Sequence, residues 1–510
     1  MKTNETNNAF LASFSSIFIN IFYGIVFTPI LLRMLGQAEF GLYQLMGAFV
    51  GYLVLFDMGF GLTVTKYVAQ YHATKDKEGE NNFLGIAVLI YGVLAILIAL
   101  VGVVLYFHLD KIFSVSLTAV ELTKAKKMFI MLIISVSAMV FGNVFSGALA
   151  GYQIFVLPRV GMIFRTVLTM ILGVVLMMNG GGGVELTLLT AILNIFLLVM
   201  NAWYAINVMK MKFTFHFFDK KLIKEMSIFS FFNFLQAIMG QIYWKFGEVI
   251  LGILTSTVLV AVYSVSMQLN QMFIGITGSI GSLLLPKATK LVTQGASPDE
   301  LTNFMVKSGR IILIIYSLFL SGFVLFGKEF LQLWAGNSYQ AAYIITIIVV
   351  SAALVPRIQA AGNDIARAYH KQGFLTVTYL LVGVLNIIIS IFAVKRYGAL
   401  GASFGTAIAL ILGNGIIANI YYHYAFKLRI RYFFKEVVRG IWIVIAVSVG
   451  FGCFLNNAIN IPKASLIIFG TKASLFALLY VVLTYHLGFN REERSRVNTY
   501  IQGFIKKRVL

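Results

Sequence analysis

The sequence predicts an all-α polytopic membrane protein, and this prediction depends on its composition and on the lengths of its apolar runs. Of 510 residues, 59% are hydrophobic and only 12% are charged, whereas a soluble globular chain carries about 25% charged residues. Apolar runs of about 20 residues, enough to cross roughly 30 Å of hydrocarbon, recur from residue 10 almost to the C-terminus. Lipid is therefore expected to be the main solvent of this chain.

Apolar runs between charged or Gly/Pro-marked breaks predict about fourteen transmembrane helices. The expected spans are 10–32, 42–62, 83–107, 128–150, 160–178, 186–208, 226–254, 258–285, 311–326, 341–355, 374–394, 399–422, 441–455 and 465–485. The first run is longer than the core of a secretory signal, and no convincing small-residue cleavage site follows it. We therefore expect an uncleaved first helix.

The distribution of basic residues predicts the orientation of these helices. With a cytoplasmic N-terminus, 28 of the 40 Lys and Arg residues fall on the cytoplasmic side, 9 on the opposite side and 3 within spans. Short loops rich in Lys and Arg remain in the cytoplasm. Both termini are thus expected to be cytoplasmic, and most of the net charge of +21 is explained without a nucleic-acid partner.

Three pairs of similar segments indicate an internal duplication. Tyr43 and Tyr263 are each followed by an apolar stretch that ends at a lysine, Lys66 or Lys287, and two further loops match in the same order. Helices 1–6 are therefore expected to repeat as helices 7–12. The expected division is an N-terminal lobe at 1–208, a C-terminal lobe at 209–425 in pseudo-twofold relation to it, two additional helices at 426–486 and a basic cytoplasmic tail at 487–510.

The sequence offers no pattern that indicates catalysis or metal binding. It has no phosphate-binding GxxxxGK[ST] loop, no HExxH pair and no Asp-rich ion loop. Cys453 is the only cysteine, and the six histidines show no spacing that would assemble a metal site or a proton relay. No catalytic residue, metal site or cofactor is expected.

Five charged residues fall within expected spans, where each costs about 2.5–3.5 kcal/mol on insertion scales. They are Asp57, Arg165, Lys245, Glu248 and Lys472. Asp57, Arg165 and Lys472 lie within about two turns of a span end, where a long side chain can reach the interface, although an aspartate is too short to do so. Lys245 and Glu248 lie deeper and three residues apart, on one helical face. They form either a mutually neutralising pair or part of a binding site.

Short motifs near the N-terminus resemble those of bacterial polysaccharide flippases. They are LGQAEFGLY at 35–43, DMGFG at 57–61 and Lys66-Tyr67. The wider group is the multidrug/oligosaccharidyl-lipid/polysaccharide exporter superfamily. The resemblance implies two lobes around a central cavity that opens alternately to each side of the plasma membrane. Lys66 stands where many relatives place arginine, which keeps the charge and loses bidentate phosphate geometry.

The resemblance implies a flippase that carries a polyprenyl-diphosphate-linked oligosaccharide for cell-surface polysaccharide synthesis. Candidate cavity charges are Lys245, Arg165, Asp57, Glu248 and Lys66. The expected partners are the lipid-linked oligosaccharide, membrane lipids and polysaccharide-assembly proteins, and the coupling ion, H⁺ or Na⁺, is left open. The alternatives are a cation-coupled multidrug antiporter of the same superfamily and a membrane polysaccharide polymerase or ligase.

The charge distribution predicts that reporters fused at Asn8 and after Arg491 both remain in the cytoplasm. A phosphatase fusion at either site should therefore be inactive, and a fluorescent fusion should be bright. Phosphatase activity at both sites would contradict the predicted orientation.

Overall fold

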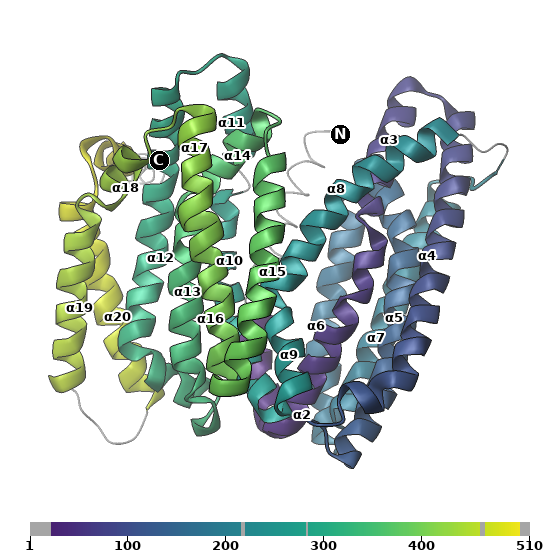
Figure 1. Cartoon of the computed structure of the whole chain (residues 1–510), viewed down its shortest axis with the longest axis horizontal. Coiled ribbons are helices and arrows are strands. Elements are labelled where there is room, and N and C mark those ends of the chain that lie inside the picture. The colour runs from purple at the N-terminus through teal and green to yellow at the C-terminus, as the bar shows by residue number, and fades with distance from the viewer. Residues whose placement is uncertain (1–21, 216–219, 282–283, 459–464, 500–510) are drawn as a thin grey trace, which may run out of the picture. The chain divides into compact units, whose positions relative to one another are not determined.

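The computed structural model describes residues 22–215, 220–281, 284–458 and 465–499, and every regular element among them is a helix (Figure 1). The chain packs as two compact units. Unit 1 comprises Met1–Val265 and Gly383–Thr406, and unit 2 comprises Ser266–Val382 and Ala407–Leu510. This packing division is no test of the lobe boundaries expected from the sequence repeat, which remain a prediction.

The structure confirms a multi-pass all-α membrane protein and leaves the count of fourteen helices unconfirmed. Eleven helices in the described part are long and apolar enough to cross a membrane, or up to thirteen if each of two bent pairs is one span. The helical stretch Tyr23–Thr74 counts once, although it overlaps both of the first two expected spans. Residues 10–21 of the first expected span lie outside the described residues.

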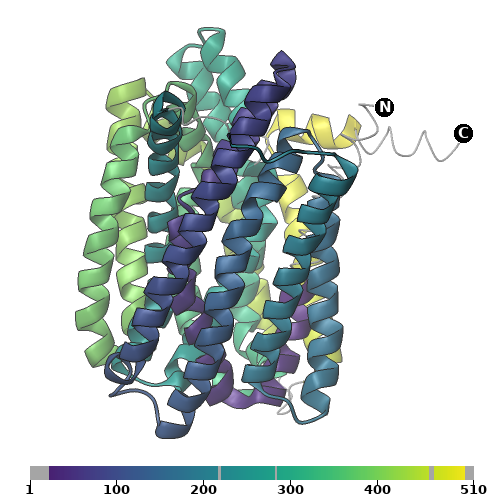
Figure 2. The ribbon, with the colours of Figure 1, turned by 90° about the vertical axis from the view of Figure 1, so that its right-hand side faces the viewer.

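Unit 1 consists mainly of long helices. Its elements are η1 (Tyr23–Phe27), α2 (Thr28–Gly51), η2 (Leu53–Asp57), α3 (Phe60–Thr74), α4 (Lys77–Ile112), α5 (Ala119–Gly151), α6 (Val156–Met178), α7 (Gly183–Trp203), η3 (Tyr204–Val208), α8 (Lys220–Trp244), α9 (Phe246–Leu254) and parts of α10 (Thr257–Gly281), α15 (Gly373–Tyr397) and α16 (Ala399–Leu410). Helices α4 and α5 lie side by side, as do α5 and α7 (Figures 1 and 2).

Unit 2 holds the rest of α10, α15 and α16 and the elements between and after them. These are α11 (Leu284–Thr293), α12 (Pro298–Trp334), η4 (Asn337–Tyr339), α13 (Ala342–Ile358), α14 (Ala360–Ala368), η5 (Ile411–Ile417), α17 (Ala418–Phe426), α18 (Ile430–Val438), α19 (Ile441–Ala458), α20 (Leu466–Leu483) and η6 (Thr484–Gly488). A further short helix covers 491–499.

Polar residues at helix starts explain why several helices extend beyond the apolar runs. Helix α12 begins with a capping box, in which the Ser297 hydroxyl accepts from the Glu300 amide and the Glu300 carboxylate accepts from the Ser297 amide. Pro298 occupies the first turn, where its missing N–H costs nothing. The 37-residue helix is therefore about 55 Å long, far longer than the expected span 311–326.

Two glycines shape the start of unit 1. Gly36 interrupts α2 with φ 74° and ψ 173°, a backbone conformation that residues other than glycine rarely adopt. At Gly41 an added Cβ would lie 1.9 Å from the Thr257 carbonyl oxygen. Glycine therefore allows α2 and the start of α10 to pack backbone to backbone.

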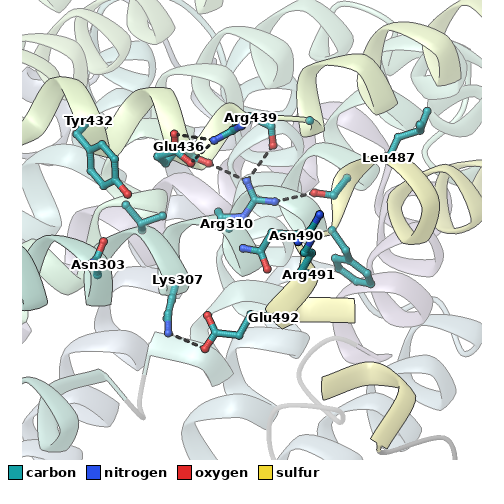
Figure 3. A pocket seen from close by; sticks show the side chains of 14 residues that line it. Asn303, Lys307, Arg310, Tyr432, Glu436, Arg439, Leu487, Asn490, Arg491 and Glu492 are labelled. Carbon is teal, nitrogen blue, oxygen red and sulfur yellow. Dashed lines mark hydrogen bonds and ion pairs between the residues drawn. The ribbon is translucent and has the colours of Figure 1, made fainter. Parts of the chain in front are cut away.

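Arg310 anchors the C-terminal part of unit 2 to α12. Its guanidinium donates five hydrogen bonds: two to the Glu493 carboxylate and one each to the carbonyl oxygens of Glu436, Arg439 and Gly488, at 2.6–3.0 Å. Arg310 is one of the residues that line a pocket of about 700 Å³ (Figure 3). Because all five donors are used and the side chain is 5% exposed, Arg310 is a structural connector.

This geometry predicts that Arg310→Gln destabilises the protein strongly. The change leaves the Glu493 carboxylate and three carbonyl oxygens without their donor, which costs about 3–5 kcal/mol when a buried charge pair is broken. Tryptophan fluorescence of purified protein during heating should show an apparent melting point several degrees below that of the parent.

The matched control is Lys307→Gln, because Lys307 and its partner Glu492 are both about half exposed and such pairs contribute little. Melting of Arg310→Gln at the temperature of the control would contradict the assigned role.

Candidate functional site

All five candidate residues lie in unit 1, and only two of them contact one another. Asp57 ends η2, Lys66 lies on α3, Arg165 on α6, Lys245 at the break between α8 and α9, and Glu248 on α9. Neither Asp57 nor Arg165 forms a hydrogen bond or an ion pair with another of the five in the described structure.

Lys245 and Glu248 form a close ion pair at a helix break. Helices α8 and α9 meet at an angle of 51°, and Lys245 is the residue between them. Its ammonium lies 3.2 Å and 3.1 Å from the two carboxylate oxygens of Glu248. The Glu248 side chain is 2% exposed, whereas that of Lys245 is 44% exposed. The carboxylate is thus fixed in the protein interior, and the lysine retains an open side.

Glu248 also has hydroxyl groups around it. Ser264 and Tyr263, both buried on α10, lie near its carboxylate. Gly247 makes room for this arrangement, since a Cβ there would lie 2.4 Å from the Tyr263 ring and hydroxyl. The sequence singled out Tyr263 through its repeat of Tyr43, but spacing alone does not place it beside Glu248.

Asp57 lies at a second helix break and has neutral partners. Met58 and Gly59, with φ 49° and 68°, separate η2 from α3. Asn143 of α5 donates its side-chain amide to Asp57 Oδ1 at 3.0 Å, and the Tyr91 hydroxyl lies beside the same carboxylate. No basic side chain in the described structure pairs with Asp57. Within the described part of the chain, its negative charge is therefore stabilised by dipoles.

Arg165 likewise has neutral partners. It lies about 14 Å along α6 from the first residue of that helix, which is deeper than the sequence indicated because α6 begins at Val156. Its Nη1 donates to Asn194 Oδ1 at 2.6 Å, and Asn194 in turn donates to Ser135 at 2.9 Å. No carboxylate in the described structure forms an ion pair with Arg165. Among the described residues, its positive charge is therefore uncompensated.

Lys66 and Lys472 differ from Asp57 and Arg165 in their surroundings. Lys66 is exposed on α3, with its ammonium 5.1 Å from the centroid of the Tyr67 ring. Lys472, in unit 2, is buried and pairs with Glu329 at 2.8 Å. A buried cation bonded to a carboxylate is explained by structure alone.

Sequence reasoning missed Arg357, which it counted among the residues of a cytoplasmic loop. The tenth span was expected to end at Val355, yet α13 continues to Ile358 and α14 follows directly. Small and apolar residues after Arg357 were the available signal, because the next charged residue is Asp364. Within the described residues, no group of three or more His, Cys, Asp or Glu side chains could hold a metal ion.

The fold resembles solved structures of membrane transporters. A lipid II flippase, MurJ, in an inward closed conformation aligns with a TM-score of 0.72 and 15% identity, over 94% of this chain and 98% of that one. An inward-facing multidrug resistance transporter of the MATE family in the MOP superfamily aligns with a TM-score of 0.66 and 14% identity, over 82% and 95%.

A eukaryotic MATE transporter, AtDTX14, aligns with a TM-score of 0.57 and 16% identity, over 85% and 99% of the two chains. These solved structures are of a flippase and of transporters. No curated protein sequence matches the chain significantly.

The family described as polysaccharide biosynthesis protein matches residues 6–292. Because this match spans more than half of the 510 residues, the chain belongs to the polysaccharide biosynthesis protein family, and its fold is that of the MurJ and MATE transporters of the MOP superfamily.

Proposed function

We propose that this chain is a flippase that moves a polyprenyl-diphosphate-linked oligosaccharide across the bacterial plasma membrane by alternating access. The transported lipid would serve cell-surface polysaccharide synthesis, and no covalent bond would form or break. Both termini would lie in the cytoplasm, where proteins that assemble the polysaccharide are candidate partners.

The observation that carries this proposal is the uncompensated charge of Arg165 on α6, which has only neutral partners. A diphosphate that enters a low-dielectric site loses hydration, and a cation already in place offsets part of that cost through charge-assisted hydrogen bonds. The family match to polysaccharide biosynthesis proteins and the fold shared with a lipid II flippase support the same proposal.

Lys245 is the second candidate cation in unit 1. Its ammonium group has three hydrogens, and two of them are enough for the hydrogen bonds to the two Glu248 oxygens. The Lys245 side chain is 44% exposed. An anion could therefore bind on its open side while Glu248 holds it in place. Glu248 then acts as a positioning residue, and it also reduces the positive charge that Lys245 presents.

Asp57 favours the second candidate function, a cation-coupled multidrug antiporter. A half-buried carboxylate with only neutral partners suits a proton, a sodium ion or a cationic substrate. In a flippase the same group would bind the coupling ion, H⁺ or Na⁺. The two functions therefore differ in the charge of the cargo.

Depletion of this protein in a bacterium that carries it should raise the cellular pool of lipid-linked oligosaccharide and lower surface polysaccharide. Radiolabelled sugar measured in the lipid and surface fractions tests this, and a plasmid copy of the parent should reverse both effects. Unchanged surface polysaccharide together with increased retention of cationic dyes would favour the antiporter.

A double-mutant cycle should separate the two roles of Lys245. Lys245→Gln leaves the buried Glu248 carboxylate unpaired and should lower the apparent melting point, since an uncompensated charge in the protein interior destabilises the folded state. The double change with Glu248→Gln should melt near the parent. If Lys245 binds cargo, the double variant should still export less than about a tenth of the parent's oligosaccharide.

Lys245→Arg is the matched control, because it keeps the charge and should retain part of the export. A double variant that accumulates normally and exports like the parent would show that Lys245 only neutralises Glu248.

A further inference from the structure

Arg357 lies near the middle of a bent membrane helix pair in unit 2. Helices α13 and α14 meet at 42° around Gln359, and together they are long and apolar enough for one broken membrane span or a re-entrant loop. Arg357 is about 23 Å of helix from Ala342 and about 17 Å from Ala368. These lengths place its backbone well away from either end of the span.

The Arg357 side chain has no partner for its charge in the described structure. Its Nε is buried without a hydrogen-bond acceptor, and the guanidinium forms no ion pair there. Arg357 lies near the buried Tyr316, whose hydroxyl already donates to the Val350 carbonyl oxygen at 2.8 Å. Tyr316 and Val350 belong to an apolar cluster with Phe273.

The buried cations Arg310 and Lys472 of unit 2 show how the fold treats a structural charge. Arg310 uses all five donors, and Lys472 pairs with Glu329 at 2.8 Å. Arg357 has the same donor capacity as Arg310, yet its buried Nε has no acceptor within the described structure. An unpaired guanidinium inside a span destabilises the folded state, so packing does not explain why arginine stands here.

The backbone around Arg357 is irregular in two adjoining places. Pro356 precedes it in α13, and the helix breaks at Gln359. Gln359 donates its side-chain amide to the carbonyl oxygen of Asn414 in η5, a π-helix that packs against α13. Broken helices and π-helical turns inside membrane proteins are found where backbone lines a site rather than lipid.

We propose that Arg357 of unit 2 binds a phosphate group of the transported substrate. This rests on the proposed function. A planar guanidinium with free donors matches two oxygens of one phosphate, which an ammonium does not. A bound anion would supply hydrogen-bond acceptors for the Arg357 guanidinium. When the anion leaves, the charge of Arg357 would again be unpaired.

The test combines stability, anion binding and transport in three purified variants. Arg357→Gln removes the unpaired charge, so without ligand it should melt at or above the parent's temperature. Sodium diphosphate should raise the parent's melting point and raise that of Arg357→Gln by clearly less. Transport of lipid-linked oligosaccharide in proteoliposomes should fall about tenfold or more in Arg357→Gln, with Arg357→Lys intermediate.

Arg367→Gln is the matched control, because Arg367 lies on the same helix pair, is half exposed and faces Asp364 at 3.6 Å. Its response to diphosphate and its transport should equal the parent's. Inorganic phosphate as a parallel ligand separates a general anion site from one that prefers diphosphate. A smaller response of Arg357→Gln to both anions supports the proposal, and an equal response to diphosphate overturns it.

Two failures are distinguishable. If the parent transports the lipid and Arg357→Gln transports equally well, or if Arg357→Gln melts far below the parent, Arg357 is structural and this inference is wrong while the flippase function stands. If the parent neither transports the lipid nor responds to diphosphate, the flippase function and this inference are both wrong.

Discussion

A charged side chain inside a membrane helix must be paired, bonded to dipoles or matched by a ligand, and this constraint sorts the intramembrane charges of the chain. Lys472 is satisfied by its ion pair with Glu329. Lys245 is paired but partly open. Arg165 has neutral partners, and Arg357 has none in the described structure. An unpaired ion inside a membrane helix destabilises the fold. The charges with the fewest partners in the described structure are therefore the strongest candidates for a functional role.

The same constraint explains where the helices break. Asp57, Lys245 and Arg357 each lie at or next to a break, between η2 and α3, between α8 and α9, and between α13 and α14. A break exposes backbone carbonyl and amide groups to which lipid cannot hydrogen-bond. A break is therefore tolerated only where protein or water forms these hydrogen bonds. Charges and breaks therefore share the same places, since both need a polar environment inside the membrane.

Much of the fold was predictable from the sequence, whereas the placement of some charged residues depended on where each helix ends. Apolar run length predicted the all-α membrane fold. A spacing of three placed Lys245 and Glu248 on one face of an expected continuous helix; the structure shows the two as an ion pair, although the helix breaks at Lys245. Arg357 was misplaced in a loop, because Pro356 ended the apolar run although the helix pair continues. The partners of Asp57 and Arg165 come from helices about 30 to 90 residues away in sequence, a packing that periodicity does not specify. The internal repeat and its lobe boundaries remain predictions.

The central claim is that the uncompensated cations serve an anionic cargo, and the most direct measurement compares two lipids in proteoliposomes that contain the purified protein. One carries an oligosaccharide on a polyprenyl diphosphate, and the other carries the same oligosaccharide through an uncharged linkage. Enzymatic labelling of the sugar on the outer leaflet reports translocation. We predict rapid translocation of the diphosphate lipid and none of the neutral one above protein-free vesicles. Equal rates for the two lipids, or no translocation of either, would contradict the claim.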